Sequence, residues 1–224
     1  MIHEKLVIPD SDPGSNPQDI LLLGSQSSSR KMLLTEAEIP FVTVAHRSSE
    51  LESIFSGDLA AYVVDIARHK MASLVLPRAQ DSVKENIFVL TADSMVQHPP
   101  SGEFFSKPEN HADAMRMLAL ARESEMLIMT GCCLREYVVV DGGWEMKRER
   151  VWATPTYIEF VVPKDEVDYF LRKAPAAMQS AGAGILEGFG ANYLKLIRGS
   201  FSGGRGLPIF ELRVALRELG FVFE

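Results

Sequence analysis

Hydrophobic residues along this chain follow two spacings, whose alternation predicts strands and helices in turn. Ile20 to Leu23 and Ile87 to Leu90 are short, continuous apolar runs, the pattern of buried strands, and the second is typical of a strand that is buried on both faces. In residues 60–74, and again from His111 to Ala121, apolar residues recur at helical spacing, which predicts two amphipathic helices. Phe41 to Ala45 is expected to form a further strand.

The second half of the chain contains a predicted hairpin. Met126 to Val140 and Val151 to Val162 are β-rich, and Asp141-Gly142-Gly143 between them has the composition of a tight turn. Lys164 to Lys173 and Leu207 to Leu219 are expected to be helices. Alternating strands and helices with an inserted hairpin indicate an α/β fold, a mixed β-sheet with flanking helices.

The first 19 residues differ from the rest of the chain. They are polar, carry three prolines and lack the apolar core of a secretory signal. We therefore expect residues 1–19 to be a flexible N-terminal extension, followed by a single domain over residues 20–224. No apolar run approaches the roughly 20 residues that a membrane-spanning helix needs.

Composition narrows the classes of function. A hydrophobic fraction of 46% and a charged fraction of 24% are ordinary for a soluble globular protein. The net charge of −7 argues against a nucleic-acid binder, although local basic residues could still bind a small anion. Cys132 and Cys133 are adjacent, a spacing that suits neither a structural disulfide nor a metal site. A reduced, cytoplasmic location is the simpler interpretation.

The segment after the first predicted strand could bind phosphate. It contains Ser25, Ser27 and Arg30 at the start of a predicted helix, where unpaired N–H groups and the helix dipole favour an anion. Arginine can bind two phosphate oxygens at once. The alternative is an ordinary helix cap with a solvated Arg30, since neither a Walker A loop nor a Gly-rich dinucleotide loop is present.

Two further positions could carry chemistry. Asp93 follows the apolar run Ile87 to Leu90, and a carboxylate where a strand ends could bind Mg²⁺ or accept a proton from water. Lys107 follows a loop that contains glycine and proline, and could meet a phosphate. Taken singly, Asp93 could equally form a turn, and the lysine could be solvated.

Lys70 and Glu50 are equally ambiguous when each is taken alone. Lys70 lies at the edge of the apolar stripe of its helix, where a lysine usually extends to water but could also reach over the lip of a cleft. Glu50 stands in a serine-containing loop and is most simply solvated.

Taken in order, these residues resemble the active-site series of the Maf family. The opening run Ser-Gln-Ser-x-x-Arg-Lys, the Ala-Asp-Ser segment around Asp93 and the Ser-Lys-Pro around Lys107 are similar to that family's motifs, and the closing motif is matched by residues 199–208. The resemblance covers roughly residues 20 to 220. The matched site residues are Ser25, Ser27, Arg30, Glu50, Lys70, Asp93 and Lys107.

This resemblance implies a Maf/inosine-triphosphatase-like fold with two lobes around a cleft. It also implies a nucleoside triphosphate pyrophosphatase, which releases a nucleoside monophosphate and pyrophosphate. Glu50 and Asp93 would hold Mg²⁺ or Mn²⁺, and Asp93 would also orient or deprotonate water. Lys70, Lys107 and Arg30 would bind phosphates, together with the loop of Ser25 and Ser27. A homodimer is possible, and no nucleic-acid or membrane partner is expected.

The resemblance also suggests which nucleobase the substrate carries. Leu186-Glu187-Gly188 and Ser29, which replaces a common arginine, are similar to a branch associated with 7-methylguanosine triphosphate, with Glu187 accepting hydrogen bonds from the base. The alternatives are a dTTP/UTP-preferring enzyme of the same family and a structural Glu187 paired with a nearby Arg or Lys. A non-catalytic nucleotide-binding regulator is the alternative of a different class.

Overall fold

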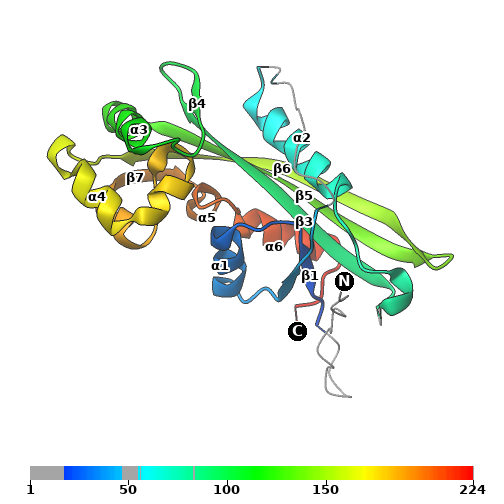
Figure 1. The fold of residues 1–224 in the computed structure, drawn as a ribbon. Coiled ribbons are helices and arrows are strands. Elements are labelled where there is room, and N and C mark those ends of the chain that lie inside the picture. The colour runs from blue at the N-terminus through cyan, green and yellow to red at the C-terminus, as the bar shows by residue number, and fades with distance from the viewer. Residues whose placement is uncertain (1–17, 47–54, 56, 83, 224) are drawn as a thin grey trace.

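The computed structural model describes residues 18–46, 55, 57–82 and 84–223 of the chain. A seven-stranded sheet runs through this part in the order β2-β1-β3-β5-β6-β7, and β4 also pairs with β3 (Figure 1). The strands are β1 (Leu21–Leu23), β2 (Phe41–Thr43), β3 (Asn86–His98), β4 (Glu103–Phe105), β5 (Met126–Val140), β6 (Gly143–Phe160) and β7 (Leu194–Gly199).

Helices flank this sheet, as the hydrophobic pattern predicts. The α-helices are α1 (Ser28–Glu36), α2 (Leu59–Ala72), α3 (His111–Glu123), α4 (Val167–Lys173), α5 (Phe201–Gly204) and α6 (Ile209–Glu218). Short 3₁₀ turns are η1 (Ala79–Asp81), η2 (Lys164–Glu166), η3 (Pro175–Gln179), η4 (Ala181–Ala183) and η5 (Gly188–Tyr193). The expected helix over 164–173 is therefore divided between η2 and α4.

Local chemistry explains where these helices begin. Ser27, Asp58 and Asn110 are the N-caps of α1, α2 and α3, and each side chain accepts a hydrogen bond from a backbone N–H of the first turn. Such caps satisfy donors that have no partner within the helix.

The predicted hairpin is confirmed, and it is longer than expected. Asp141 and Gly142 both have positive φ angles, 50° and 77°, as a tight hairpin turn requires. β6 begins at Gly143 rather than at Val151, because the charged residues that precede Val151 pair with β5 through backbone atoms and keep their side chains largely exposed.

The sheet has two kinds of pairing. β1 pairs in parallel with β2 and β3, and the other pairings are antiparallel. β3 is longer than its apolar run suggests: it continues through Asp93 to His98. The expectation that a strand ends at Asp93 is therefore wrong, because β5 pairs with polar and apolar residues of β3 alike through the backbone.

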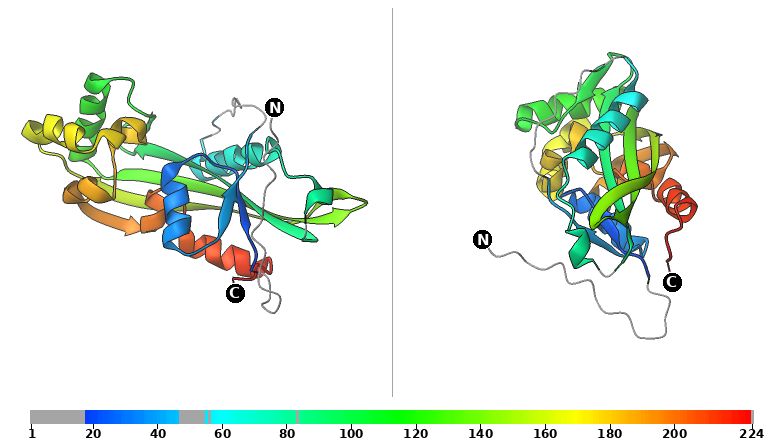
Figure 2. Two further views of the ribbon diagram at one scale, coloured as in Figure 1. Left: turned by 60° about the horizontal axis from the view of Figure 1, so that its bottom comes forward. Right: turned by 90° about the vertical axis from the view of Figure 1, so that its right-hand side faces the viewer.

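The molecule has two lobes and three apolar cores, one core in the first lobe and two in the second. One core lies in the lobe of α3, α4 and the end of β6 around Phe160 and Phe170. The second packs α1 and α6 on one face of the sheet through residues such as Leu34 and Leu216. The third packs α2 on the opposite face around Ala67. Figure 2 shows α2 and α6 on opposite sides of the sheet.

Asp19, at the end of the expected N-terminal extension, is held by the folded domain. It is buried, its carboxylate pairs with Lys84 at 2.6 Å, and its backbone N–H donates to the carbonyl of Val222. Residues 1–17 lie outside the described part of the chain. Within that part, no helix has the length and hydropathy needed to cross a membrane.

The two cysteines are buried free thiols on β5. Burial raises the pKa of both, that of Cys133 to about 12, with the charge of Glu149 acting in the same direction. Both therefore remain protonated thiols near neutral pH.

Gly131 allows α2 to pack closely on the sheet. This residue of β5 pairs with Asp93, and a Cβ atom placed on it would lie 2.5 Å from the carbonyl oxygen of Val63 in α2. The backbone of α2 is also held to β3 where the hydroxyl of Thr91 donates to the carbonyl of Ala67 at 2.6 Å.

We expect Gly131→Ala to force α2 away from the sheet. Overpacking of this kind costs about 1–3 kcal/mol, so thermal unfolding should show a clear fall in Tm. Gly143→Ala is the matched control, because its Cβ would meet only the Val140 carbonyl at an ordinary 3.7 Å. Equal Tm values for the two variants would contradict the packing argument.

Candidate active site

Along one edge of β3, the first part pairs with β1 and the last part pairs with β4. β1 pairs with Phe88–Leu90, and β4 pairs with Val96–His98. Residues 91–95 lie between these pairings, and no strand of the described chain pairs with them on this edge. Asp93 and Ser94 are therefore next to the point where the chain leaves β1 and enters the serine loop.

Strand alternation sends Asp93 and Ser94 to opposite faces of the sheet. Asp93 is on the face that α2 covers, where Lys70 in the last turn of α2 meets it. The Lys70 Nζ atom lies 2.6 Å from Asp93 Oδ1 and 3.5 Å from the carbonyl oxygen of Ala92. Both side chains stay partly accessible, at 33% for Lys70 and 17% for Asp93.

Ser94 belongs to a buried polar network on the other face. Its hydroxyl is 2.8 Å from the hydroxyl of Thr130 on β5, which donates to the carbonyl of Gly203 at 2.9 Å. Arg30 joins the same network, because its Nη2 donates to the Ser94 hydroxyl at 3.2 Å.

Arg30 is buried, which excludes the alternative of a solvated side chain. Its Nε donates to the carbonyl of Gly206 at 2.8 Å and its Nη1 to the hydroxyl of Ser25 at 3.1 Å. Burial lowers the pKa of this guanidinium, and the charge of Asp93 opposes that shift. Arg30 therefore holds the first and last segments of the site together.

Ser25 and Ser27 make different hydrogen bonds. The Ser27 hydroxyl caps α1 by accepting a hydrogen bond from the backbone N–H of Arg30. The Ser25 hydroxyl accepts from the backbone N–H of Ser27 and from Arg30, so its own proton can be donated to a ligand. The expected helix cap is confirmed for Ser27, and the binding of phosphate by Ser25 and Ser27 stays a prediction.

His46 is a site residue that the sequence pattern did not single out. Its Nδ1 lies 3.0 Å from the hydroxyl of Ser73, which donates to the carbonyl of Lys70, and its Nε2 lies 3.2 Å from the carbonyl oxygen of Gly24. It therefore connects the serine loop to the end of α2. A single histidine in a loop gives no periodic signal that could have identified it.

In the described part of the chain, two further residues predicted for the site, Lys107 and Glu187, are not part of the hydrogen-bonded groups around Asp93 and Ser94. Lys107 is exposed after β4, and the antiparallel register of β4 turns the chain back along β3 towards Ser94. Within the described ranges, no hydrogen bond or ion pair joins the Lys107 side chain to Asp93. Glu187 precedes η5 and pairs with Arg205 at 3.4 Å, the structural alternative anticipated for it. Glu50 lies outside the described residues.

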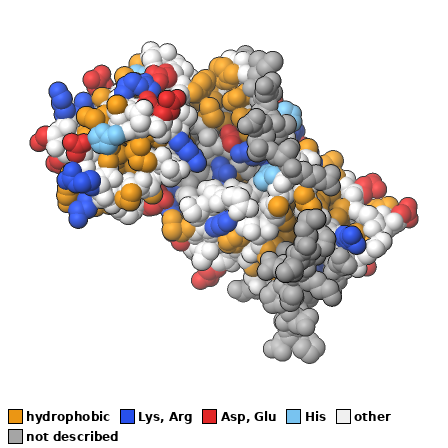
Figure 3. All heavy atoms as spheres, in the orientation of Figure 1, with side chains coloured by type: hydrophobic (Ala, Val, Ile, Leu, Met, Phe, Trp, Pro, Cys, Tyr) orange, Lys and Arg blue, Asp and Glu red, His pale blue; other side chains and the backbone are white. Residues whose placement is uncertain are grey.

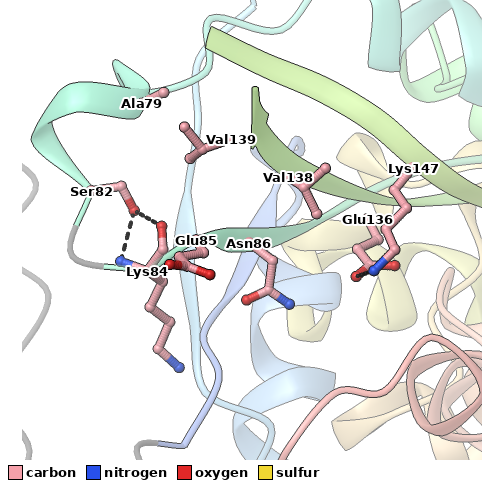
Figure 4. A pocket seen from close by; sticks show the side chains of 9 residues that line it. All are labelled: Ala79, Ser82, Lys84, Glu85, Asn86, Glu136, Val138, Val139 and Lys147. Atoms are coloured by element: carbon pink, nitrogen blue, oxygen red, sulfur yellow. Dashed lines mark hydrogen bonds and ion pairs between the residues drawn. The ribbon is translucent and has the colours of Figure 1, made fainter. Parts of the chain in front are cut away.

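A hollow opens between the two lobes. Figure 3 shows basic and acidic side chains reaching the surface within it. A different pocket, of about 630 Å³, lies at the far end of the sheet near the β5–β6 hairpin (Figure 4). It contains none of the residues that join Asp93 to Arg30; its lining includes Lys84, Glu85, Asn86, Glu136 and Lys147.

The sequence of the chain matches a known protein family. The model of the family described as Maf-like protein matches residues 20–219. The chain belongs to the Maf-like protein family. The matched residues thus include almost all of the described structure.

Curated relatives of this Maf-like protein cover nearly its full length. It is 31% identical to the dTTP/UTP pyrophosphatase of Acholeplasma laidlawii over 205 residues, which is 91% of this chain and 98% of that protein. It is 29% identical to the dTTP/UTP pyrophosphatase of Chlamydia trachomatis over 88% of this chain and 93% of the relative. The nucleoside triphosphate pyrophosphatase of Chlamydia muridarum is 27% identical over the same shares.

The donor chemistry of this Maf-like site suits a hard cation held together with a ligand. Asp93 offers a carboxylate, and Lys70 is bonded to only one of its two oxygens. No group of three or more His, Cys, Asp or Glu residues that could hold a metal occurs in the part of the chain that the structure describes. A carboxylate oxygen that is free of the lysine is the kind of donor that a hard divalent cation uses together with substrate phosphates.

We expect Arg30→Lys to destabilise the protein, although it keeps the charge. A single ammonium cannot reproduce the planar fork that serves Gly206, Ser25 and Ser94. Unmatched buried acceptors cost about 1–3 kcal/mol per group, which chemical denaturation should detect. Lys31→Ala is the control on the same helix, because Lys31 bonds Gln26 at the exposed surface. An Arg30→Lys protein as stable as Lys31→Ala would contradict the assigned role.

Proposed function

We propose that this Maf-like protein hydrolyses a nucleoside triphosphate to a nucleoside monophosphate and pyrophosphate. The observation that supports this most is the Lys70–Asp93 pair on the part of β3 that lacks a neighbouring strand on one edge. On the opposite face of the sheet, Arg30 donates to the next residue, Ser94, and also to Ser25. The names of the relatives from Acholeplasma and Chlamydia point to the same reaction. The Lys70–Asp93 pair also favours an enzyme over a non-catalytic regulator.

In this proposal Asp93 acts on water. One carboxylate oxygen is held by Lys70 at 2.6 Å, which fixes the orientation of the group. The other oxygen can accept a proton from a water molecule that attacks the α-phosphorus. The bond between the α-phosphorus and the bridging oxygen breaks, and pyrophosphate leaves with that oxygen.

Cationic side chains stabilise the charge that develops on the phosphates. Lys70 has three N–H donors and uses two, towards Asp93 and Ala92, so one can face a phosphate. Arg30 has five N–H groups, of which three serve the protein. Lys107, exposed after β4, completes the proposed clamp. Such prepositioned donors are a main source of rate enhancement in phosphoryl transfer.

The site would also use a divalent cation, Mg²⁺ or Mn²⁺. Asp93 and Glu50 are the proposed protein ligands, and the cation would neutralise phosphate charge when bound. The preferred nucleobase is less constrained than the reaction. The Leu186-Glu187-Gly188 segment favours 7-methylguanosine triphosphate, whereas two of the relatives are named for dTTP and UTP. We also propose a cytoplasmic protein, with a homodimer as its possible assembly.

Asp93→Asn should retain the fold and lose at least about 100-fold in kcat, because an amide cannot accept the proton from water. Release of pyrophosphate and monophosphate from a panel of nucleotides tests both the variant and the reaction. Near-normal turnover by a folded Asp93→Asn protein would remove Asp93 from this role. Diphosphate and orthophosphate as the main products of the unmodified protein would refute the proposed reaction.

Removal of metal should abolish turnover. We expect no pyrophosphate release in excess EDTA and recovery on addition of Mg²⁺ or Mn²⁺, because the triphosphate charge is otherwise neutralised only by lysine and arginine. The measurement is the rate before and after dialysis, with circular dichroism to show that the fold is unchanged. Undiminished activity after exhaustive chelation would contradict the metal assignment.

A further inference from the structure

His46 lies where the serine loop, residues 24–27, meets the end of α2. A β-bridge between His46 and Leu74, just after α2, fixes the backbone there. The imidazole is half-buried, with its Nδ1 3.0 Å from the hydroxyl of Ser73 and its Nε2 3.2 Å from the carbonyl oxygen of Gly24. Both ring nitrogens therefore have a hydrogen-bond partner, one on each of the two segments.

Both of these partners accept a hydrogen bond from the ring. The carbonyl oxygen of Gly24 has no proton to donate. The Ser73 hydroxyl has one proton, which it donates to the carbonyl of Lys70 at 2.9 Å, so that its lone pairs remain for Nδ1. Neutral imidazole carries a proton on one ring nitrogen only, whereas imidazolium carries one on each. All the contacts of His46 are therefore satisfied only when the ring is protonated.

His98 shows that this requirement is not general for the histidines of this fold. The Nδ1 of His98 lies 2.7 Å from the hydroxyl of Ser101, which accepts a hydrogen bond from the backbone N–H of Glu103. The hydroxyl proton of Ser101 is thus available to Nδ1, and a neutral ring suits this position. The demand for two ring donors comes from the particular partners of His46.

The charges near His46 act in both directions. Among the described residues, the elements that meet it carry three basic side chains and one acidic one: His69 and Lys70 of α2, Arg30 of α1 and Asp93 of β3. The basic groups oppose a positive charge on the ring, and Asp93 favours it. The C-terminal end of a helix also favours a cation, and His46 meets α2 at that end.

We infer that His46 is a positioning residue that acts as an imidazolium and, by donating from both ring nitrogens, sets the place of Ser25 relative to Lys70. Gly24 directly precedes Ser25, and the Ser73 hydroxyl is bonded to the carbonyl of Lys70. When the ring loses its proton, the Ser73 hydroxyl must turn to Nδ1 and leave that carbonyl. The effect on turnover rests on the proposed function, and the protonation of the ring does not.

The first test is the nuclear magnetic resonance spectrum of the imidazole. Histidine changes its charge between about pH 5 and 8, so both ring N–H protons should be protected from exchange at about pH 5.5. Their signals are assigned by their loss in His46→Gln. Ser73→Ala removes the acceptor at Nδ1, and only the Nε2 proton should then stay protected. A single protected ring proton in the unmodified protein overturns the inference.

The second test is the pH dependence of turnover. Glutamine places an amide nitrogen near the position of Nε2, so His46→Gln keeps a donor for Gly24, has none for Ser73 and does not titrate. At about pH 5.5 its kcat/KM should be at least about tenfold below that of the unmodified protein, and the difference should largely disappear at about pH 8.5, where the unmodified ring is neutral. An equal difference at both pH values indicates a purely structural role and refutes the inference.

Two further variants make this result specific. In Ser73→Ala the added His46→Gln change should have little effect on kcat/KM, because both side chains then donate to Gly24 alone. His111→Gln is the matched control, since His111 lies in the other lobe and pairs with Asp168 at the exposed surface. Its kcat/KM relative to the unmodified protein should be the same at both pH values. Circular dichroism shows whether each variant is folded.

Failure of the proposed function can be distinguished from failure of this inference. If the unmodified protein releases no pyrophosphate from any nucleoside triphosphate, the proposed reaction is wrong. The spectra of the unmodified protein and of Ser73→Ala then decide the role of His46 alone. Two protected ring protons that become one in Ser73→Ala support it, and the same ring signals in both proteins refute it.

Discussion

The site depends on a short stretch of β3 whose one edge has no strand beside it. β1 ends at Leu23 while β3 continues to His98, so the chain that leaves β1 must turn beside residues 91–95. β5 pairs with the opposite edge without interruption there, so this stretch remains part of the sheet. The alternation of side chains then places Asp93 and Ser94 on opposite faces, so that elements from both faces of the sheet reach the same short segment.

The buried charge of Arg30 explains why several segments of the chain meet beside this stretch of β3. A buried guanidinium is costly unless each of its donors finds an acceptor, and Arg30 finds them on the serine loop, on β3 and on the closing segment. Each acceptor comes from a different part of the sequence, so satisfying Arg30 brings those parts together. Lys70 and Asp93 are less buried, which is consistent with groups that must remain accessible to a substrate.

A second buried arginine joins the two lobes. Arg205 links Glu36 of α1 to Glu187 in the lobe that contains η5. The backbone of residues 205 and 206 is also held to α1, because the Ser29 hydroxyl donates to the Arg205 carbonyl and Arg30 donates to the Gly206 carbonyl.

The hydrophobic pattern by itself determined most of the elements, because burial imposes the period of each element on its sequence. It missed the continuation of β3 through Asp93 and the early start of β6, where backbone pairing alone extends a strand past polar residues. Ordered motifs also brought Ser25, Arg30, Lys70 and Asp93 into one candidate site.

Only the tertiary structure decided the partners of these residues. It showed that Arg30 is buried rather than solvated, that His46 connects Gly24 to Ser73, and that Glu187 stands beside Arg205. Such contacts join residues far apart in the chain: Arg205 meets Glu36 across 169 positions. Local sequence sets which side chains are available, but packing of the whole domain sets which charges face one another, and that pairing determines what each group can bind.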